Sequence, residues 1–388
     1  MEVSIFIGEV SREAFSGPAR YGRSLVLGLA ERGIGCDVHT YRWESGNRNQ
    51  PNVNVRVYTP IVSIGNLQIS PSLARSAFAG VKDIVQVHGV RNFQCEIGAL
   101  TSTLQNRPLV IVPHGSLLGY KRAFSGRGGR WLSAAYDIAT VRASTRSASA
   151  IVVTSSIEEE DALEFGIPRE KVVRIPYGMS LPPGEPVEAK PGARETKIVL
   201  TVTRLTAKNN LEFLVRGFAR ALKGGARLHL LVVGGVKASG FNPEETGYHR
   251  RLLNLVSELQ VADSVTFAGW KTETELWEIY RGADVFAWTS RYDNFARALV
   301  EAAWFGLPIV STPVGVAPDL LAHGQGGRLV KHDDYEGLAN ALVYLAEERT
   351  PTVMEAQENR DKAAGYTVEK MVTGYIELYQ RLVAEQSG

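Results

Sequence analysis

The segment SRYDNFARALVEAAWFGLP, residues 290–308, contains two carboxylates eight positions apart, Asp293 and Glu301. An apolar stretch precedes it and a helical pattern follows Asn294, so a strand, a polar loop and a helix are predicted in that order. If residues 293–301 rise as a helix, the two acids stand roughly 12 Å apart, at about 1.5 Å per residue. The alternative is that Asp293 only caps the helix and Glu301 only faces solvent.

The start of that helix offers a different kind of contact. The backbone N–H groups near Asn294, Phe295 and Ala296 would lack partners within the helix and carry the positive end of its dipole, which binds phosphate and other anions. A sugar, a diphosphate and a ribose laid end to end would suit this arrangement. The two carboxylates would accept hydrogen bonds from the hydroxyls of the sugar and the ribose, and the anion site between them would hold the diphosphate.

Two cations are predicted beside the same loop. Residues 197–203 read as a strand, and Arg204 and Lys208 lie in the loop and first turn that follow it. Two fixed cations neutralise a diphosphate and stabilise it as a leaving group. The alternative is a solvated basic turn.

Short apolar runs alternate with amphipathic segments along almost the whole chain, which is the pattern of βαβ units and parallel sheets. The predicted strands are Val3–Gly8, Cys36–Tyr41, Ile84–His88, Leu109–Pro113, Ala150–Thr154, Val172–Ile175, Lys197–Thr203, Leu228–Val233, Val265–Ala268, Val285–Thr289, Pro308–Ser311 and Arg328–Val330. Helices are predicted at Arg23–Arg32 and Trp131–Ser147, among others. We expect an α/β fold of two Rossmann-like domains whose parallel sheets face each other across a cleft, with ligands at the carboxyl ends of the strands.

A stretch rich in Pro, Gly and Glu separates the two halves of the chain. We therefore expect an N-terminal domain of residues 1–182, a hinge of residues 183–194 and a C-terminal domain of residues 195–365. A final helix, residues 366–388, carries an apolar stripe and is expected to pack back on the N-terminal domain. The stripe consists of Met371, Val372, Tyr375, Leu378, Tyr379 and Leu382.

The second half carries a dense set of motifs: Arg204-x-x-x-Lys208, LHLLVVGG, VTFAGW, LWEIYRGADVFAWTSRYDNFARALVEAAWFGLPIVSTPVG and GGRLVKHDDYEGLANAL. In this order they resemble the donor-binding half of the family 4 retaining glycosyltransferases of the GT-B fold. The first half resembles the same family more loosely, in SGPARYGRSLVLGLAERGIGCDVHTY, IVPHGSL and IVVTSSIEEEDALEFGIPREKVVRIPYGMS. The resemblance covers nearly the whole chain.

The resemblance implies a role for each matching position. Arg204 and Lys208 would hold the diphosphate of a nucleotide-sugar, Asp293 would bind hydroxyls of the donor sugar, and Glu301 would bind the ribose. The backbone amides at Asn294, Phe295 and Ala296 would contact the sugar and the phosphates, and Gly269 and Trp270 would lie against the base. Gly17 would approach the phosphates, and His114 would lie near the transferred sugar. The implied catalytic residues are Arg204, Lys208, Asp293 and His114.

Four positions depart from the family pattern, and they leave the identity of the sugar open. Asp293 stands where the family usually has Glu, and Ala296 where it has Gly. The opening loop has one glycine, Gly17, instead of two, and Tyr177 precedes Gly178 where Asn is usual.

The implied activity is transfer of a sugar from a nucleotide-diphospho-sugar to a saccharide or lipid-linked acceptor, with retention and without a metal or other cofactor. An alternative is a non-catalytic nucleotide-sugar-binding partner subunit, which the departures at Asp293 and Ala296 make conceivable. A dinucleotide-dependent oxidoreductase would have similar sheets, but no G-x-G-x-x-G follows the first strand of either domain. The sequence leaves the nucleotide, the linkage and the oligomeric state open.

Residues 107–146 are basic, with aromatic side chains interleaved, and include Lys121, Arg122 and Arg127. They would receive an anionic acceptor or touch an anionic membrane surface; the alternative is a solvated helix and loop. Nucleic acid is not expected as a partner, because the net charge is only +2 and an acidic run at 158–161 interrupts the basic residues. His332, Asp333 and Asp334 suggest a metal site, but a helix cap followed by a helix at 335–346 is the preferred interpretation.

Two cysteines are too few for a disulfide framework, and the N-terminus reads as a strand. No apolar run approaches 18 residues. We therefore expect a cytoplasmic protein, with peripheral contact at the inner face of the membrane left open.

Overall fold

The computed structural model describes residues 1–11, 17–44, 50–64, 67–118, 140–182, 194–235, 243–321, 326–348 and 353–387. The chain divides into two compact units. Unit 1 consists of Met1–Ser180 together with Tyr366–Gly388, and unit 2 of Leu181–Gly365. The sequence places the corresponding boundaries at residues 182, 195 and 366, and all but the last residue of the expected hinge, 183–194, lies outside the described residues.

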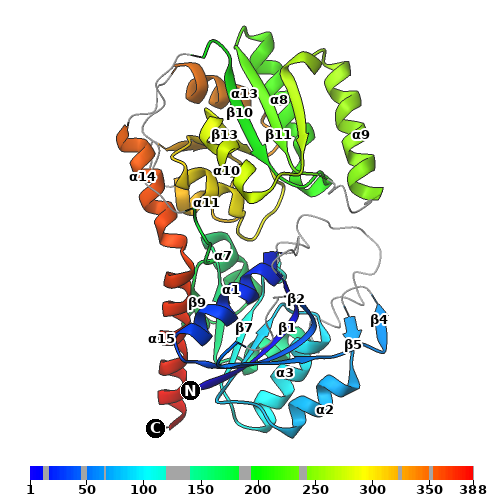
Figure 1. The fold of residues 1–388 in the computed structure, drawn as a ribbon, viewed down its shortest axis with the longest axis vertical. Coiled ribbons are helices and arrows are strands. Elements are labelled where there is room, and N and C mark those ends of the chain that lie inside the picture. The colour runs from blue at the N-terminus through cyan, green and yellow to red at the C-terminus, as the bar shows by residue number, and fades with distance from the viewer. Residues whose placement is uncertain are drawn as a thin grey trace. The chain divides into compact units, whose positions relative to one another are not determined.

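Unit 1 is built on a parallel sheet, whose described strands run in the order β3-β2-β1-β6-β7-β8-β9 (Figure 1). The bounds are β1 Glu2–Ser11, β2 Gly35–Glu44, β3 Val53–Val57, β6 Ile84–His88, β7 Leu109–Val112, β8 Ala150–Val153 and β9 Val172–Arg174. Every residue of β6, β7 and β8 is buried, because helices cover both faces of the sheet. A separate antiparallel pair joins β4 Val62–Ile64 to β5 Leu67–Ile69.

The described helices of unit 1 are α1 Gly17–Glu31, α2 Pro71–Ala79, α3 Phe93–Leu104, α6 Arg142–Ser147, α7 Ser156–Phe165 and α15 Val368–Ser387. Among them, α2, α3 and α7 begin after Ser or Asn residues that cap them. Ser155 caps α7 by accepting a hydrogen bond from the Glu158 amide, and Gly166 ends it in the left-handed conformation.

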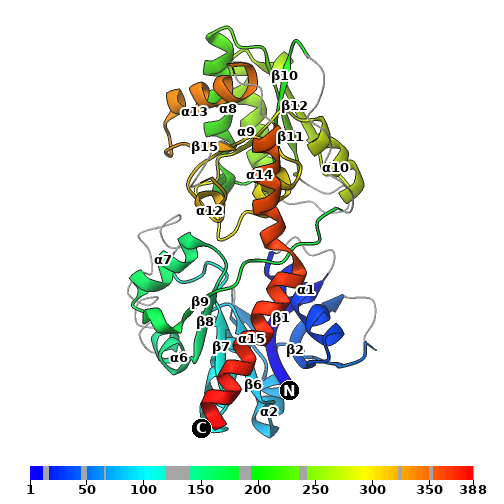
Figure 2. The same ribbon diagram turned by 90° about the vertical axis from the view of Figure 1, so that its left-hand side faces the viewer.

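The C-terminal helix α15 packs on unit 1 through the predicted apolar stripe. All six stripe residues are buried. A Cβ at Gly28 of α1 would lie 2.4 Å from Cγ2 of Val372, so the two helices approach too closely for any larger residue at position 28. Figure 2 shows α15 lying across the sheet beside β1 and β6, and its Tyr379 hydroxyl bonds to Gln86 of β6.

Unit 2 contains a second parallel sheet with the described order β12-β11-β10-β13-β14-β15 (Figure 1). Its strands are β10 Lys197–Val202, β11 Leu228–Val233, β12 Val265–Gly269, β13 Val285–Trp288, β14 Ile309–Ser311 and β15 Gly327–Leu329. Its described helices are α8 Leu211–Lys223, α9 Pro243–Glu258, α10 Glu273–Gly282, α11 Arg297–Trp304, α12 Ala317–Leu321, α13 Tyr335–Val343 and α14 Val353–Ala363. The core includes the fully buried Phe213, Leu214 and Phe218 of α8.

The predicted strands are all present, with Ile84–His88 and Leu228–Val233 correct to the residue. The sequence missed β3 and the β4–β5 pair, because β3 is a largely exposed edge strand without an apolar run. The helix predicted at Arg23–Arg32 begins earlier, at Gly17. The sequence did not indicate this start because the first turns contain Gly and Pro, which obscure the helical pattern. Of the helix predicted at Trp131–Ser147, residues 131–139 lie outside the described part, and α6 occupies its end.

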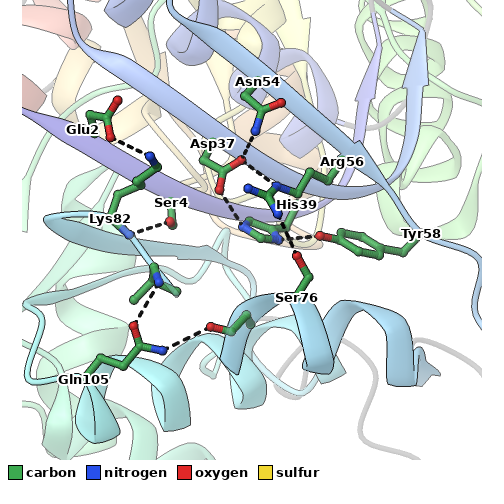
Figure 3. Close-up of polar contacts among 12 residues, drawn as sticks. Glu2, Ser4, Asp37, His39, Asn54, Arg56, Tyr58, Ser76, Lys82 and Gln105 are labelled. Atoms are coloured by element: carbon green, nitrogen blue, oxygen red, sulfur yellow. Dashed lines mark hydrogen bonds and ion pairs between the residues drawn. The ribbon is translucent and has the colours of Figure 1, made fainter. Parts of the chain in front are cut away.

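A polar cluster centred on the buried Asp37 and His39 holds β2 and β3 together (Figure 3). Asp37 Oδ1 accepts hydrogen bonds from Asn54 Nδ2 at 2.8 Å and Arg56 Nε at 3.0 Å. Asp37 Oδ2 lies 3.4 Å from His39 Nε2, and the other ring nitrogen of His39 bonds to the Tyr58 hydroxyl at 2.9 Å. Burial alone would raise the pKa of Asp37, but its hydrogen bond to His39 and the charge of Arg56 outweigh burial and lower it.

The lowered pKa of Asp37 makes the stability of unit 1 sensitive to acid. The carboxylate stabilises the fold above its unfolded pKa of about 3.9, and this contribution is lost as the pH falls through the lower, folded value. Asp37→Ala leaves Arg56 and His39 without their shared acceptor and should cost about 3 kcal/mol in unfolding free energy at neutral pH. Urea denaturation followed by circular dichroism measures this.

The matched control is Glu44→Ala, which removes an exposed ion pair with Arg42 from the same strand. It should cost less than about 1 kcal/mol. Equal losses in the two variants would contradict the assignment, as would an Asp37→Asn variant with the same acid dependence as the wild type.

Candidate functional site

Lys208 and Asp293, one of the predicted cations and the first predicted acid of unit 2, meet where the strand order of its sheet reverses, between β10 and β13. Ligands of such sheets bind at this point, beyond the carboxyl ends of the strands. The loops after β10 and β13 are bonded to each other: the Lys208 carbonyl accepts from the Ser290 hydroxyl at 3.2 Å and from the Arg291 amide at 2.9 Å. The Thr289 hydroxyl donates to the Asn210 carbonyl at 3.3 Å.

Lys208 and Asp293 form an ion pair across these two loops. Lys208 Nζ lies 3.6 Å from Asp293 Oδ2, and both side chains are half-buried. Lys208 Nζ also lies 5.6 Å from the centre of the Tyr292 ring. Arg204 is exposed near the start of the same loop, two residues after β10 ends at Val202. The structure thus brings Lys208 and Asp293 into direct contact, with Arg204 four residues before Lys208.

The helix after this loop begins later than the sequence suggests. The sequence pattern predicted a helix from the residue after Asn294, whereas α11 spans Arg297–Trp304 and Ala296 before it has a φ of 62°. The estimate of about 12 Å between the two acids assumed a helix that begins at residue 293. Because α11 begins only at Arg297, that assumption is wrong. The alternative, in which Asp293 only caps the helix, is also wrong: its Oδ1 accepts from the amides of Phe295, at 3.2 Å, and Ala296, at 3.0 Å, within the loop.

The left-handed conformation of Ala296 costs roughly 1–2 kcal/mol and is imposed by packing from a more distant segment. The loop after β14 crosses here, where Gly315 has a φ of 55° and the Val316 amide donates to the Phe295 carbonyl at 2.9 Å. A Cβ at Gly315 would lie 2.7 Å from the Phe295 carbonyl carbon. The conformation of residues 293–296 therefore depends on a glycine about 20 residues later.

Glu301 is held by Tyr280, a residue to which the sequence assigned no role. The Tyr280 hydroxyl donates to Glu301 Oε2 at 2.9 Å, and Arg297 lies 3.6 Å from Oε1. Burial and the nearby Glu301 charge raise the pKa of Tyr280 well above its usual value, so this hydroxyl remains a donor. Tyr280 sits in the apolar pattern of α10, where nothing in the sequence distinguishes it from a core aromatic residue.

The ends of β11 and β12 come close to this edge of the sheet. The Gly234 amide donates to the Gly269 carbonyl at 2.9 Å, and a Cβ at Gly234 would lie 1.9 Å from the Thr203 carbonyl oxygen. Only glycine fits there. Trp270, directly after β12, is 43% exposed and offers an aromatic surface.

In unit 1 the predicted residues lie near the equivalent reversal of strand order, between β1 and β6. Tyr21 of α1 is fully buried, and its ring lies 5.0 Å from the rings of both His114 and Tyr177. The Tyr177 hydroxyl donates to the Gly17 carbonyl at 3.0 Å. Gly17, His114 and Tyr177 therefore belong to one cluster around Tyr21, which the sequence did not single out.

A buried carboxylate fixes the turn that presents His114. His114 and Gly115 have φ values of 52° and 74°. Glu158 accepts a hydrogen bond from the Gly115 amide through Oε1, and from the amide and hydroxyl of Thr154, both at 2.8 Å, through Oε2. Burial raises the pKa of Glu158, against these three hydrogen bonds, which lower it. Glu158 was part of the acidic run in the sequence, and only the tertiary structure reveals its function in the turn.

Burial lowers the pKa of His114 to about 3, so its imidazole is neutral at physiological pH. The residue as a whole is still partly exposed. It can therefore contact a ligand as a neutral group.

The remaining predicted residues fall into two groups. Lys121, Arg122 and Arg127 lie outside the described residues. Asp334 caps α13 by accepting from the Gly337 amide at 2.8 Å, which confirms the cap interpretation. Among the residues that the structure describes, no group of three or more His, Cys, Asp or Glu side chains is placed to hold a metal ion.

Two α/β units, each with a parallel sheet and with its candidate residues at the carboxyl edge, define the GT-B fold. The family described as Glycosyltransferase Family 4 matches residues 15–181, and the family described as Glycosyl transferases group 1 matches residues 186–365. The two matches together span most of the chain, which belongs to the family 4 glycosyltransferases.

Curated relatives match at moderate identity. Mannosylfructose-phosphate synthase of Agrobacterium fabrum is 29% identical over 51% of this chain and 45% of that protein. D-inositol 3-phosphate glycosyltransferase of Nocardia farcinica is 27% identical over 80% of this chain and 68% of that protein. The chain spans about half the length of most of the curated relatives it matches.

Solved structures match over nearly the full length. Sucrose-phosphate synthase from Thermosynechococcus elongatus has a TM-score of 0.74 and 20% identity, covering 99% of both chains. HepE of Anabaena in complex with UDP has a TM-score of 0.73 and 19% identity, covering 98% of this chain and all of that one. At these identities the likeness shows the fold. A search of the described helices finds none with the length and apolar character needed to cross a membrane.

Replacement of Gly315 by Ala should disturb the site through the loop it supports. The new Cβ would meet the Phe295 backbone at 2.7 Å in a left-handed conformation, so we expect a loss of about 2 kcal/mol in stability. Thermal unfolding and ligand titration measure the effect. Gly225→Ala is the control, because Gly225 also has a positive φ, of 97°, but open space around it. If the two variants lost stability equally, the contact with Phe295 would have no part in shaping the site.

Proposed function

We propose that the protein is a retaining, metal-independent glycosyltransferase that moves a sugar from a nucleotide-diphospho-sugar to a saccharide or lipid-linked acceptor. The observation that carries the proposal is the Lys208–Asp293 ion pair at the strand-order reversal of unit 2. It brings a cation that would bind the diphosphate into contact with a carboxylate that would bind the sugar, at the edge where such sheets bind ligands.

Lys208 and Arg204 would neutralise the diphosphate as it leaves. Lys208 Nζ lies 3.6 Å from Asp293 Oδ2, a distance that leaves room for a stronger, shorter contact to a phosphate oxygen. Charge that develops on the leaving diphosphate then meets cations already in position, which is the most effective form of electrostatic stabilisation.

Asp293 and Glu301 would accept hydroxyl groups of the donor. Asp293 uses Oδ1 to hold the loop amides, so Oδ2 is the oxygen that would meet the sugar. Glu301, oriented by the Tyr280 hydroxyl, would accept from the ribose. A carboxylate that is already held in place loses less side-chain entropy on binding.

The donor and the acceptor follow from different arguments. HepE of Anabaena has been solved in complex with UDP and with UDP-glucose, which makes UDP-glucose the first donor to test here. Two relatives carry a phosphorylated acceptor or product in their names, so sugar and inositol phosphates belong in the first acceptor panel beside lipid-linked saccharides.

Loss of the cation or of the second acid should abolish most of the activity. Lys208→Ala and Glu301→Ala are expected to lower kcat/KM for sugar transfer by about 100-fold to 1000-fold, as does removal of one preorganised electrostatic group in other enzymes. Release of nucleoside diphosphate, measured with a panel of nucleotide-sugars, tests this. Lys223→Ala at the exposed end of α8 is the charge-matched control and should not change the rate.

Unchanged rates in both site variants would refute the assignment. Donor binding by calorimetry without transfer to any acceptor in the panel would instead favour a non-catalytic nucleotide-sugar-binding subunit.

Retention and metal independence have their own test. The new glycosidic bond should have the anomeric configuration of the donor, as read by proton NMR of the first product formed. The rate should also be unchanged by EDTA, because Arg204 and Lys208 supply the positive charge. An inverted product would refute retention, and loss of activity that added Mg²⁺ or Mn²⁺ restores would refute metal independence.

A further inference from the structure

Four side chains connect the C-terminal helix of unit 1 to His114. Tyr379 lies on α15, Gln86 and His88 lie on β6, and His114 follows β7. Tyr379 and Gln86 are fully buried, His88 is nearly so, and His114 is partly exposed at the carboxyl edge of the sheet. A row of hydrogen bonds thus runs from the interior of unit 1 to a group that can meet a ligand.

Each bond in this row has a defined direction. The Tyr379 hydroxyl donates to Gln86 Oε1. Gln86 Nε2 lies 2.9 Å from His88 Nε2, and because an amide nitrogen can only donate, this ring nitrogen of His88 accepts. His88 Nδ1 lies 2.9 Å from His114 Nε2.

The protonation of the two histidines completes the assignment. Burial, with a smaller effect of His114, lowers the pKa of His88 well below its ordinary value, and burial lowers that of His114 to about 3. Both rings are therefore neutral and carry one hydrogen each. His88 accepts at Nε2, so its hydrogen is on Nδ1 and is donated to His114 Nε2. The hydrogen of His114 must then be on Nδ1.

We propose that Tyr379, Gln86 and His88 are positioning residues that fix His114 in the Nδ1–H tautomer, so that it offers a neutral hydrogen-bond donor to a ligand oxygen. Its use in sugar transfer rests on the proposed function, but the tautomer itself does not. Among the described residues, the structure gives His114 no hydrogen-bond partner other than His88, so the Nδ1 hydrogen is available to a ligand.

Tyr379 is the residue that decides the direction. If the Gln86 amide turned over, its oxygen would face His88 Nε2, every bond in the row would reverse, and His114 would present a lone pair. Burial raises the pKa of Tyr379 far above its usual value, so the hydroxyl keeps its hydrogen and donates it to Gln86 Oε1. With the amide turned over, this hydrogen would have no acceptor among the described residues, so the bond to Tyr379 favours the orientation with the amide oxygen on its side. A residue 293 positions away from Gln86 along the chain thereby sets the chemistry of the site.

Nitrogen NMR of the full-length protein labelled in its histidines tests the proposal directly. The two nitrogens of a neutral imidazole differ in type, pyrrole-like with hydrogen and pyridine-like without. At neutral pH we expect a pyrrole-like Nδ1 for His114, assigned by its loss in His114→Gln. A pyrrole-like Nε2 in the wild type would overturn the proposal.

Tyr379→Phe tests the origin of the tautomer. It should give His114 a mixture of both tautomers and lower kcat/KM for transfer by about tenfold, the value of one hydrogen bond. Tyr375→Phe is the matched control: Tyr375 is equally buried on the same helix, and its hydroxyl bonds to Tyr21 and not to the row. It should keep the wild-type tautomer. An unchanged His114 spectrum in Tyr379→Phe would refute the role of Tyr379.

The outcomes separate this inference from the proposed function. If His114 has the Nδ1–H tautomer and no nucleotide-sugar is turned over, the proposed function is refuted, but the role of Tyr379, Gln86 and His88 in fixing the tautomer is supported. If sugar transfer is confirmed and His114 carries its hydrogen on Nε2, the proposed role of Tyr379, Gln86 and His88 is refuted, but the proposed function is supported.

Discussion

The candidate site of unit 2 depends on one interaction, the contact of Lys208 with Asp293 between two loops that leave neighbouring strands in opposite directions. The backbone of Lys208 also accepts hydrogen bonds from Ser290 and Arg291, so the cation and the loop that carries the acid are positioned by the same residue. Displacement of either loop would separate the charges. The parallel sheet beneath supplies the rigid support that such a pair requires.

In both units, buried polar groups hold a partly exposed functional side chain in place. In unit 2, Tyr280 orients Glu301. In unit 1, Glu158 holds the backbone turn at His114, and the row from Tyr379 reaches its ring. These supporting groups are buried, and each is either uncharged or fully hydrogen-bonded. Water therefore does not compete for their hydrogen bonds.

Sequence reasoning succeeded where local pattern determines structure. Buried parallel strands such as β6 and β11 are short apolar runs, and the stripe of α15 repeats at helical spacing. It failed where distant contacts decide: the start of α11 depends on Gly315, and edge strand β3 carries no apolar run to mark it. The candidate residues came from motifs, whereas the partners that orient them, Tyr280 and Glu158, look in sequence like a core aromatic and a surface acid.

The insertion of unit 2 between the two segments of unit 1 has a consequence for biosynthesis. A ribosome releases residues 181–365 before α15, so unit 2 can complete its fold while unit 1 still lacks its last helix. During that interval the face of α1 around Gly28 and the buried end of Gln86 have no cover. A nascent chain stalled at this stage would expose this face to chaperones, and it is covered only when α15 has been translated.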